Sequence, residues 1–515
     1  MAEYINIRVA PQYKDDKAYW KKAISRSNHR PIEDISDVTL VKRSIDARGK
    51  SPKYQLRVQV FYESEEEVQA PIGITYNKLS DAKEVIIVGA GPCGYFAALQ
   101  CIELGLCPIV LDRGKDVRAR RRDLRDIQQH HKVNPDSNYC FGEGGAGTYS
   151  DGKLYTRSVK RGNVKKVLQV LVDHGAKTDI LIDAHPHIGS NKLPQIVSNI
   201  RETIESAGGK VHFNKQVVDF QIEAGKIVKV TAQDGYEYEG DAVVLCTGHS
   251  ARDIYELCHR KGINIEFKPF AMGMRLEHPQ PLIDKIQYNQ PKGDYLPAAS
   301  YALSCQVDNH GVFSFCMCPG GLIVPAATSP GELVVNGMSL SKRDSAFANA
   351  AMVVTIDDNP KGDDVFGGVR YQQALERKIF NHGDGSQAAP AQRVTDFLKG
   401  RVSSTLPASS YIPGVYTAPL HELLPKDIVL RIKQALKIFD QRMKGYITSE
   451  AQFVGLESRT SAPIRIPRDK VSLMHEDVEG LFPAGEGAGY AGGILSAALD
   501  GERIAVAVKD YLFCS

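Results

Sequence analysis

The sequence lacks the long apolar runs and the one-sided charge that mark membrane proteins and polyanion-binding proteins. No stretch of the 515 residues comes near the roughly 18 uninterrupted apolar residues that a membrane span requires. The 64 Lys and Arg residues nearly balance the 61 Asp and Glu residues, so the net charge is only +3. We therefore expect no membrane partner and no nucleic-acid partner.

Secretion signals and metal-ligand spacings are also missing. The first eleven residues carry charge early and lack an apolar signal core. The ten cysteines are scattered and include no CxxC pair that could chelate zinc or exchange thiols. With 43% hydrophobic and 24% charged residues, the composition is that of an ordinary globular chain. We expect reduced thiols, a cytoplasmic location and no metal site.

The first 80 residues predict a small α+β module of the ferredoxin-like kind. Strands are expected near 4–9, 38–44 and 54–62, and a helix near 15–25. Alternation with polar residues puts the apolar side chains of the last strand on one face. An acidic run and a Pro-Gly turn at 63–73 predict a linker. Packing on the rest of the chain is the simpler expectation for this module, and binding of RNA or a partner protein is the alternative.

A βαβ dinucleotide-binding unit follows the linker. A β-branched run leads into Gly89, Gly91 and Gly94 in a GxGxxG pattern, then a helix and a second strand that ends at Asp112. The first glycine makes the turn, the second lets the backbone approach a pyrophosphate, and the third lets the helix pack on the sheet. The helix start supplies free N–H groups and a positive dipole end to the phosphates. Asp112 is expected to bind the adenosine ribose.

A second glycine-rich turn lies near the C-terminus. A strand at 481–484 precedes Gly485, Glu486 and Gly487, and a long helix is expected from Gly492 onward. This helix start would face the ribityl–pyrophosphate arm of a flavin and the ring edge where reduction places negative charge. Glu486 would bind a ribityl hydroxyl. The second motif therefore favours FAD as the dinucleotide, whereas close helix packing is the alternative explanation for the small residues that follow.

These patterns predict an α/β chain with a discontinuous, Rossmann-like FAD-binding domain. We place the N-terminal module at 1–80, the FAD-binding domain at 81–250 and 470–515, and an inserted α+β cap or substrate domain at 251–469. One amphipathic helix is expected in the cap, at 428–439. No second GxGxxG follows a strand there, so a permanent NAD(P)H domain is not expected.

Three segments resemble the FAD-dependent oxidoreductases of the glutathione-reductase-like, two-dinucleotide-binding superfamily: 85–94, 243–250 and 482–493. More narrowly, the chain is similar to uncharacterised bacterial proteins labelled NAD(FAD)-utilising dehydrogenases. The resemblance runs the whole length and implies FAD as the cofactor, without a settled substrate. The superfamily more often has Glu where this chain has Asp112.

The motifs and the resemblance together assign cofactor contacts along the chain. Arg113 would lie beside the adenosine, the backbone at Val217 and Val218 would meet the adenine, and Lys153 would lie near flavin N5 or the phosphate, unless it is a surface amine. The full expected set is Gly89, Gly91, Pro92, Cys93, Gly94, Asp112, Arg113, Gly145, Ser150, Lys153, Val217, Val218, Thr247, Gly248, Gly485, Glu486, Gly487, Gly492, Gly493 and Ile494.

Three residues are candidates for catalysis. Cys316 and Cys318 stand two apart in a predicted strand, so they would face the same way as a redox pair or a reactive thiol over the flavin. Two small residues in a tight core are the alternative. His249 follows a strand end and is a candidate proton donor. Arg459 and Arg465 could hold a carboxylate substrate or form structural ion pairs.

The basic run at 115–126 has two interpretations. Interleaved Asp residues favour a solvated helix face, and the alternative is that Arg120, Arg121 or Arg122 grips the 2′-phosphate of NADPH. We expect an FAD-dependent oxidoreductase that moves hydride or electrons to or from a small-molecule substrate or acceptor, with NAD(P)H as a candidate transient donor. The alternatives are an RNA-associated flavoprotein that uses the N-terminal module as an adaptor, and a non-catalytic FAD-binding protein.

Overall fold

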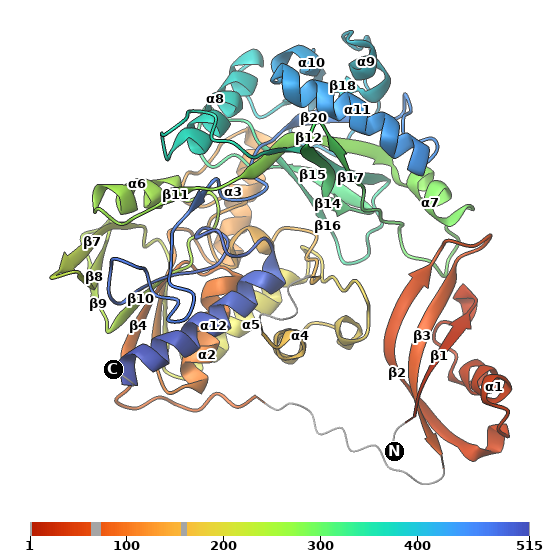
Figure 1. The fold of residues 1–515 in the computed structure, drawn as a ribbon, viewed down its shortest axis with the longest axis horizontal. Coiled ribbons are helices and arrows are strands. Elements are labelled where there is room, and N and C mark those ends of the chain that lie inside the picture. The colour runs from red at the N-terminus through yellow and green to blue at the C-terminus, as the bar shows by residue number, and fades with distance from the viewer. Residues whose placement is uncertain (1–2, 63–73, 156–161, 514–515) are drawn as a thin grey trace.

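The computed structural model describes residues 3–62, 74–155 and 162–513, and the predicted linker at 63–73 lies outside them. Figure 1 shows a parallel sheet with its helices, a larger mixed sheet above it, and the N-terminal module to one side. Mixed α/β architecture is therefore confirmed. Within the described residues no helix is both long and apolar enough to cross a membrane.

The parallel sheet has the order β22 (Leu481–Pro483), β10 (Ala242–Leu245), β4 (Glu84–Val88), β5 (Cys107–Leu111) and β6 (Lys210–His212). One face packs on α2 (Pro92–Glu103), α4 (Val164–Asp173), α5 (Leu193–Ser206) and α12 (Ile494–Phe513). The other face packs on α6 (Arg252–Arg260) and the antiparallel sheet β7 (Val217–Glu223), β8 (Lys226–Ala232) and β9 (Glu237–Glu239). Coverage of both faces explains why these strands are continuously apolar.

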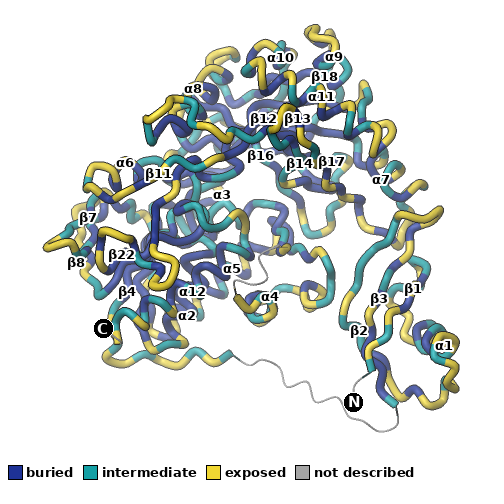
Figure 2. The backbone as a smooth tube through the Cα atoms, in the orientation of Figure 1, coloured by how far each residue is buried: buried dark blue, intermediate teal, exposed yellow. Residues whose placement is uncertain are grey.

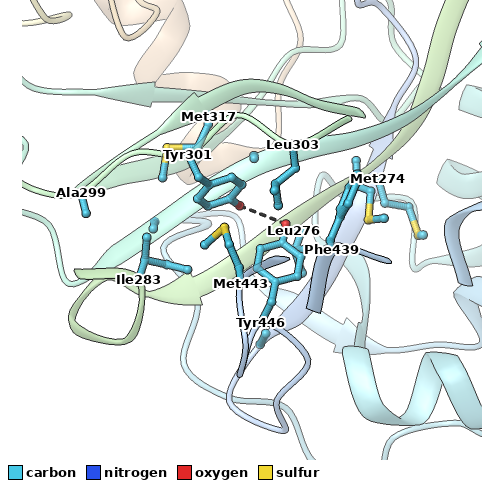
Figure 3. Close-up of a cluster of buried hydrophobic side chains, with 14 of the residues drawn as sticks. Met274, Leu276, Ile283, Ala299, Tyr301, Leu303, Met317, Phe439, Met443 and Tyr446 are labelled. Atoms are coloured by element: carbon cyan, nitrogen blue, oxygen red, sulfur yellow. Dashed lines mark hydrogen bonds between the residues drawn. The ribbon is translucent and has the colours of Figure 1, made fainter. Parts of the chain in front are cut away.

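The larger sheet has the order β13 (Ser304–Val307), β14 (His310–Cys318), β17 (Phe347–Ile356), β12 (Phe270–Pro279), β20 (Gln452–Glu457), β18 (Ala389–Arg393) and β19 (Val415–Thr417). Its neighbouring strands are antiparallel except β18 and β19. Figure 3 shows Phe439 of α11 (Lys426–Arg442) near Met274 and Leu276 of β12, with the Tyr446 hydroxyl donating to the Tyr301 hydroxyl at 3.2 Å. This larger sheet forms the core of the region that lies, in the sequence, between β10 and β22 of the parallel sheet.

This region contains more helix than the sequence pattern predicted. Besides α11 it has α6, α7 (Gln280–Tyr288), α8 (Gly367–His382), α9 (Val394–Lys399) and α10 (Leu420–Leu423), so the expectation of a single helix is wrong. In α8 the polar residues Gln372 and Glu376 are buried in the same stripe as Leu375 and Ile379. Two polar residues in the inner stripe conceal the apolar period that a sequence analysis looks for.

One longer helix and several short elements connect the sheets. They are α3 (Val117–His130), the 3₁₀ turns at Gly145–Gly147 and Thr178–Leu181, the paired strands β15 (Gly321–Pro325) and β16 (Val335–Ser339), and the paired strands β11 (Glu266–Phe267) and β21 (Ile464–Arg465). The β15–β16 pair matters most for the site, because it brings the cap toward the end of the parallel sheet.

The N-terminal module contains β1 (Glu3–Val9), α1 (Lys17–Asn28), β2 (Ile35–Asp46) and β3 (Lys53–Tyr62), with 3₁₀ turns at Pro11–Tyr13 and Ile32–Asp34. The sheet is antiparallel in the order β1-β3-β2. Leu56, Val58 and Val60 are buried on one face, as the alternation predicts. This βαββ order is the first part of a ferredoxin-like βαββαβ unit. Because the described residues of the module include no second helix or fourth strand, the ferredoxin-like assignment stays a prediction.

The module packs against its own chain. Arg43 of β2 forms an ion pair with Asp183 at 2.7 Å, and its backbone N–H donates to the carbonyl of Ile182 at 2.8 Å. Tyr54 donates its hydroxyl to the carbonyl of Tyr295 at 3.2 Å. Figure 2 shows exposed and intermediate residues along the outer helix α1, of which only Trp20 and Ile24 are buried. The contacts tie one edge of the module to residues 182–184 and to the loop after α7.

Candidate functional site

A cavity of about 830 Å³ lies at the carboxyl ends of β4, β5 and β10. Its wall includes Gly89, Asp112 and Thr247 from these strand ends, and Phe315 and Gly337 from the cap. Open α/β sheets bind ligands at this edge, and the volume lies within the range of cofactor sites. The cavity therefore has the position and the size that a dinucleotide requires.

The three glycines of the GxGxxG motif have separate physical reasons. At Gly89 the backbone has a φ of +112°, and a Cβ would overlap the carbonyl oxygen of Cys246. At Gly94 a Cβ would overlap the carbonyl oxygen of Gly89. At Gly91 a Cβ would meet no protein atom within 4 Å and would stand at the cavity wall. The protein's own packing thus requires two of the glycines, whereas the third leaves space for a ligand.

The second glycine-rich turn meets the same cavity. Gly492 and Gly493 line it just before α12 begins, and a Cβ at either position would meet no protein atom within 4 Å. The two helices are held together deeper in the core, because a Cβ at Gly501 of α12 would overlap the carbonyl oxygen of Cys93 in α2. Two helix starts and their bare backbones therefore face one cavity, and this cradle fits the FAD that the sequence predicts.

Asp112 organises the first turn as well as lining the cavity. Its carboxylate accepts hydrogen bonds from the backbone N–H of Ala90 at 2.9 Å and of Gly114 at 2.8 Å. The neighbouring Arg113 forms an ion pair with Asp253 and lies over the Phe141 ring, 4.6 Å from its centroid. The carboxylate keeps free lone pairs for a ribose hydroxyl, because it accepts only one bond at each oxygen.

Most of the predicted cofactor residues line the cavity, but four do not. Gly94, Gly485 and Gly487 lie behind its wall, where their missing Cβ atoms permit close packing. Val218 is exposed and points away, because neighbouring strand residues face opposite sides. The predicted residues that line the cavity, including the three catalytic candidates, are Gly89, Gly91, Pro92, Cys93, Asp112, Arg113, Gly145, Ser150, Lys153, Val217, Thr247, Gly248, His249, Cys316, Cys318, Glu486, Gly492, Gly493 and Ile494.

Cys316 and Cys318 do not follow the regular alternation that the sequence analysis assumed. The pairing of β14 with β17 shifts between Phe315 and Cys318, and Cys316 has a φ of +42°. This bulge exposes Cys316 and buries Cys318, although both line the cavity. The guanidinium of Arg275 donates to the Cys316 carbonyl at 2.6 Å and to the Cys318 sulfur at 3.3 Å. The prediction that the two thiols share one strand face is therefore wrong, because the bulge adds a residue between them.

Burial sets the protonation of the site. Although Cys316 keeps exposed surface along the cavity, desolvation by the surrounding groups raises the pKa of its thiol to about 12, with Lys153 and Arg275 offsetting only part of the effect. Burial lowers the pKa of His249 to about 4, aided by the nearby charges of Arg459 and Arg252. It raises the pKa of Glu486 to about 7, against the opposing influence of Lys268. At neutral pH the thiol is protonated, the imidazole is neutral and Glu486 is close to its midpoint.

None of the candidate anion-binding arginines lines the cavity with an unmatched charge: Arg459 is paired inside the protein, and those of α3 are buried or exposed away from it. Arg459 lines the cavity but donates to both oxygens of Glu376 at 3.0 and 2.9 Å and to Glu332 at 2.8 Å, so its charge is matched inside the protein. Arg120 is fully buried, whereas Arg121 and Arg122 are exposed on α3. A buried Arg120 cannot reach a 2′-phosphate in the cavity, and its exposed neighbours agree with a solvated helix face.

Several cavity residues carried no usable signal in the sequence. Asn336 and Gly337 come from β16, and Tyr155 follows the glycine-rich loop. Lys215 stands just before Val217, so its place beside the adenine segment could have been inferred from the spacing. The cap residues reach the cavity through tertiary packing alone. The described residues contain no group of three or more His, Cys, Asp or Glu side chains placed to hold a metal ion.

Comparison with known proteins defines the class of this chain. A family model described as "FAD dependent oxidoreductase" matches residues 193–297, and one described as "FAD-dependent protein, C-terminal domain-like" matches 269–460. A domain of unknown function matches 1–61. An "Uncharacterized protein" of Clostridium beijerinckii is 40% identical over 515 residues, covering 95% of this chain and 96% of that protein. The chain belongs to this FAD-dependent oxidoreductase family, and FAD is the cofactor that the matched models describe. The matches do not favour the RNA-associated alternative, and the narrower glutathione-reductase-like assignment stays a prediction.

Solved structures give weaker likenesses. The flavin-dependent brominase Bmp2 is 11% identical with a TM-score of 0.37 and covers 83% of this chain and 79% of its own. CtdE in complex with FAD is 12% identical with a TM-score of 0.31 and covers 83% of this chain and 84% of its own. A geranylgeranyl bacteriochlorophyll reductase-like protein from Thermoplasma acidophilum is 11% identical with a TM-score of 0.36 and covers 84% and 79%. These scores are too low to carry an argument about activity.

Proposed function

We propose that the protein is an oxidoreductase that holds FAD along this cavity and oxidises or reduces a small molecule at its cap end. The observation that carries the proposal is that two helices begin at one cavity, at Gly91 and at Gly492–Gly493, with no side chain on the backbone that faces it. When bound, FAD supplies hydride or electron transfer between a donor and an acceptor. The protein supplies position, charge and exclusion of water.

The adenosine end of the ligand belongs beside Arg113 and Val217, with Asp112 available to a ribose hydroxyl. The pyrophosphate belongs at Gly91 and Gly145, where the backbone is bare and α2 presents the positive end of its dipole. These placements follow the order of the cavity-lining strands from β5 to β4. They also agree with the general preference of anions for the N-terminus of a helix.

The substrate end belongs against the cap, where β14 and β16 contribute Phe315, Cys316 and Asn336. The Cys316 thiol keeps its proton at neutral pH and acts there as a hydrogen-bond donor. Neutral His249 has the same capacity only if its proton is on the nitrogen that faces the cavity, because its other nitrogen, Nδ1, lies 2.8 Å from the Ser250 hydroxyl. A redox pair formed with Cys318 would need thiolates, which desolvation of both sulfurs disfavours.

Lys153 supplies positive charge at the cap end. Its ammonium donates to the carbonyl of Met317, next to Cys316, and it lines the cavity. The neighbouring Asp151 is already paired with Arg343, so the positive charge of Lys153 is not cancelled locally. An anionic or electron-rich group of the ligand or substrate is favoured at this position.

The proposal is tested by spectroscopy of the purified protein. A bound flavin gives a yellow absorbance that anaerobic NADH or NADPH bleaches if a nicotinamide visits the shared cleft as donor. Bleaching by one nucleotide identifies the donor, and bleaching only by dithionite points to another donor. Flavin that no donor or acceptor turns over would leave FAD binding intact but contradict the oxidoreductase activity. Protein that neither contains flavin nor binds added FAD would contradict the whole proposal.

A further inference from the structure

Arg120 is a fully buried arginine without a carboxylate partner among the described residues. Other fully buried or nearly buried arginines are matched: Arg275 by Glu457 at 2.8 Å, Arg459 by Glu376 at 2.9 Å and Arg468 by Asp500 at 2.7 Å. The guanidinium of Arg120 instead bonds only to neutral acceptors in this part of the chain. Its acceptors are the carbonyl oxygens of Asn138 (2.8 Å), Gly142 (3.3 Å), Glu143 (2.8 Å) and Gly145 (2.9 Å).

These carbonyls belong to the loop that lies against the GxGxxG turn. The N–H of Gly144 donates to the carbonyl of Ala90 at 2.8 Å, and a Cβ at Gly145 would come within 3.3 Å of the Gly91 Cα. Gly145, Ala146 and Gly147 line the cavity, whereas Arg120 does not. The loop therefore separates the buried guanidinium from the cavity, directly beside Gly91.

Arg120 also sets the direction of a peptide dipole in the cavity wall. The Gly145 carbonyl points at the guanidinium, and the structure has no cis peptide among its described residues. In a trans peptide the N–H and the C=O point in opposite directions, so the N–H of Ala146 is directed away from Arg120. Its positive end therefore faces the side on which Ala146 lines the cavity.

The positive charge of Arg120 lies behind the cavity wall, with the loop between it and the cavity. The side chain is 0% exposed, and the intervening material is one layer of backbone rather than water. The Tyr149 ring, whose centroid lies 5.0 Å from the guanidinium, is a second neutral contact, and Asp112 acts on the charge only through space. A buried positive charge of this kind favours an anion on the other side of the loop.

We propose that Arg120 is a positioning residue for the pyrophosphate of the bound dinucleotide. It fixes the loop through four carbonyls and adds positive potential behind Gly91 and Ala146, without touching the ligand. A planar guanidinium with five N–H donors suits this task, whereas a lysine has three donors on a flexible stem. The inference rests on the proposed function, because it assumes that the anion beside Gly91 is the pyrophosphate of FAD.

The test compares FAD with riboflavin, which lacks both the pyrophosphate and the adenosine. Dissociation constants of FAD and of riboflavin are measured by flavin fluorescence on wild type, Arg120→Met and the control Arg122→Met, which changes an exposed arginine of the same helix. We expect Arg120→Met to weaken FAD binding at least about tenfold while riboflavin binding changes less than about twofold. The control should leave both constants unchanged, and far-ultraviolet circular dichroism verifies the fold of each variant.

An equal loss of both flavins, or no loss of either, would overturn the inference while leaving FAD binding by the wild type intact. Absence of FAD binding by the wild type would overturn the proposed function and this inference together. If Arg120→Met fails to fold, Arg120→Lys is tested instead, because lysine keeps the positive charge but has only three N–H donors in place of the five of the guanidinium. It should raise the ratio of the FAD to the riboflavin dissociation constant about threefold or more, and an unchanged ratio would refute the role.

Discussion

Replacement of Gly91 by alanine tests whether the missing Cβ at this position leaves room for the pyrophosphate of FAD. Gly91 has a φ of −79°, which alanine adopts readily, and its Cβ would meet no protein atom within 4 Å. Folding should therefore be unaffected, or stabilised by about 0.4–1 kcal/mol, because alanine restricts the unfolded chain. The methyl group would instead keep the pyrophosphate from the backbone N–H groups. Loss of one or two charge-assisted hydrogen bonds costs about 3 kcal/mol, or roughly 100-fold in FAD affinity.

The assay separates stability from binding. Urea denaturation of the flavin-free protein gives the unfolding free energy, and titration of flavin fluorescence gives the FAD dissociation constant. Gly94→Ala is the matched contrast, because its Cβ would overlap the Gly89 carbonyl and should destabilise the protein with or without FAD. Gly49→Ala, which meets only the Ser51 carbonyl at 3.8 Å, should change stability no more than Gly91→Ala does and should leave the FAD dissociation constant unchanged. Wild-type FAD affinity in Gly91→Ala, or a stability loss like that of Gly94→Ala, would refute the reasoning.

Three further predictions concern charge and thiol chemistry. Because burial raises the pKa of Glu486 to about 7, ionisation of this residue lowers the unfolding free energy by up to about 3 kcal/mol as pH rises from about 4.5 to 7. In urea denaturation of the flavin-free proteins, the unfolding free energy of Glu486→Gln should therefore rise relative to that of wild type between about pH 4.5 and pH 8. Parallel pH profiles of the two proteins would contradict this. Arg459→Met leaves two buried carboxylates, Glu376 and Glu332, with Arg252 as their main remaining partner, and this unmatched negative charge should cost about 3–5 kcal/mol of stability. Exposed Arg465→Met should cost under about 0.5 kcal/mol, and equal losses would argue against the internal ion pairs. The rate of iodoacetamide labelling of Cys316, read by peptide mass spectrometry, should still rise about tenfold per pH unit between about pH 9.5 and 10.5, and a plateau from about pH 9.5 would show an ordinary thiol.

The nucleotide-binding half of the fold could be predicted because each local signal agreed with the global one. The β-branched strand, the three glycines and the acid after the second strand all follow from backbone approach and packing, which leave clear marks in a sequence. The burial of Arg120 was not predicted, although the sequence contains a signal for it. Val117, Arg120, Leu124 and Ile127 recur at helical spacing and are all buried, so one arginine of the basic run belongs to the inner stripe.

The cap side of the site could not be predicted, because its geometry depends on contacts between distant segments. The bulge at Cys316 is held by Arg275, which lies 41 positions earlier in the chain. The contribution of Gly337 depends on the way β16 packs beside β12 and β14. Neither arrangement has a local sequence period. The predicted boundaries of the cap, 251 and 469, also stay predictions. We propose 269 and 460 instead, because α6 and β21 pack in the core around the parallel sheet.

The central claim is that one FAD molecule spans the cavity from Arg113 to the cap, with its pyrophosphate between the two bare helix starts. A crystal structure of the protein with FAD tests this most directly. The account predicts phosphate oxygens within hydrogen-bonding distance of the backbone at Gly91 or Ala146, and the flavin ring beside Cys316, with α12 beginning against the ligand. Density for FAD at another place, or a bound FAD that leaves Gly492 and Gly493 without contact, would contradict it.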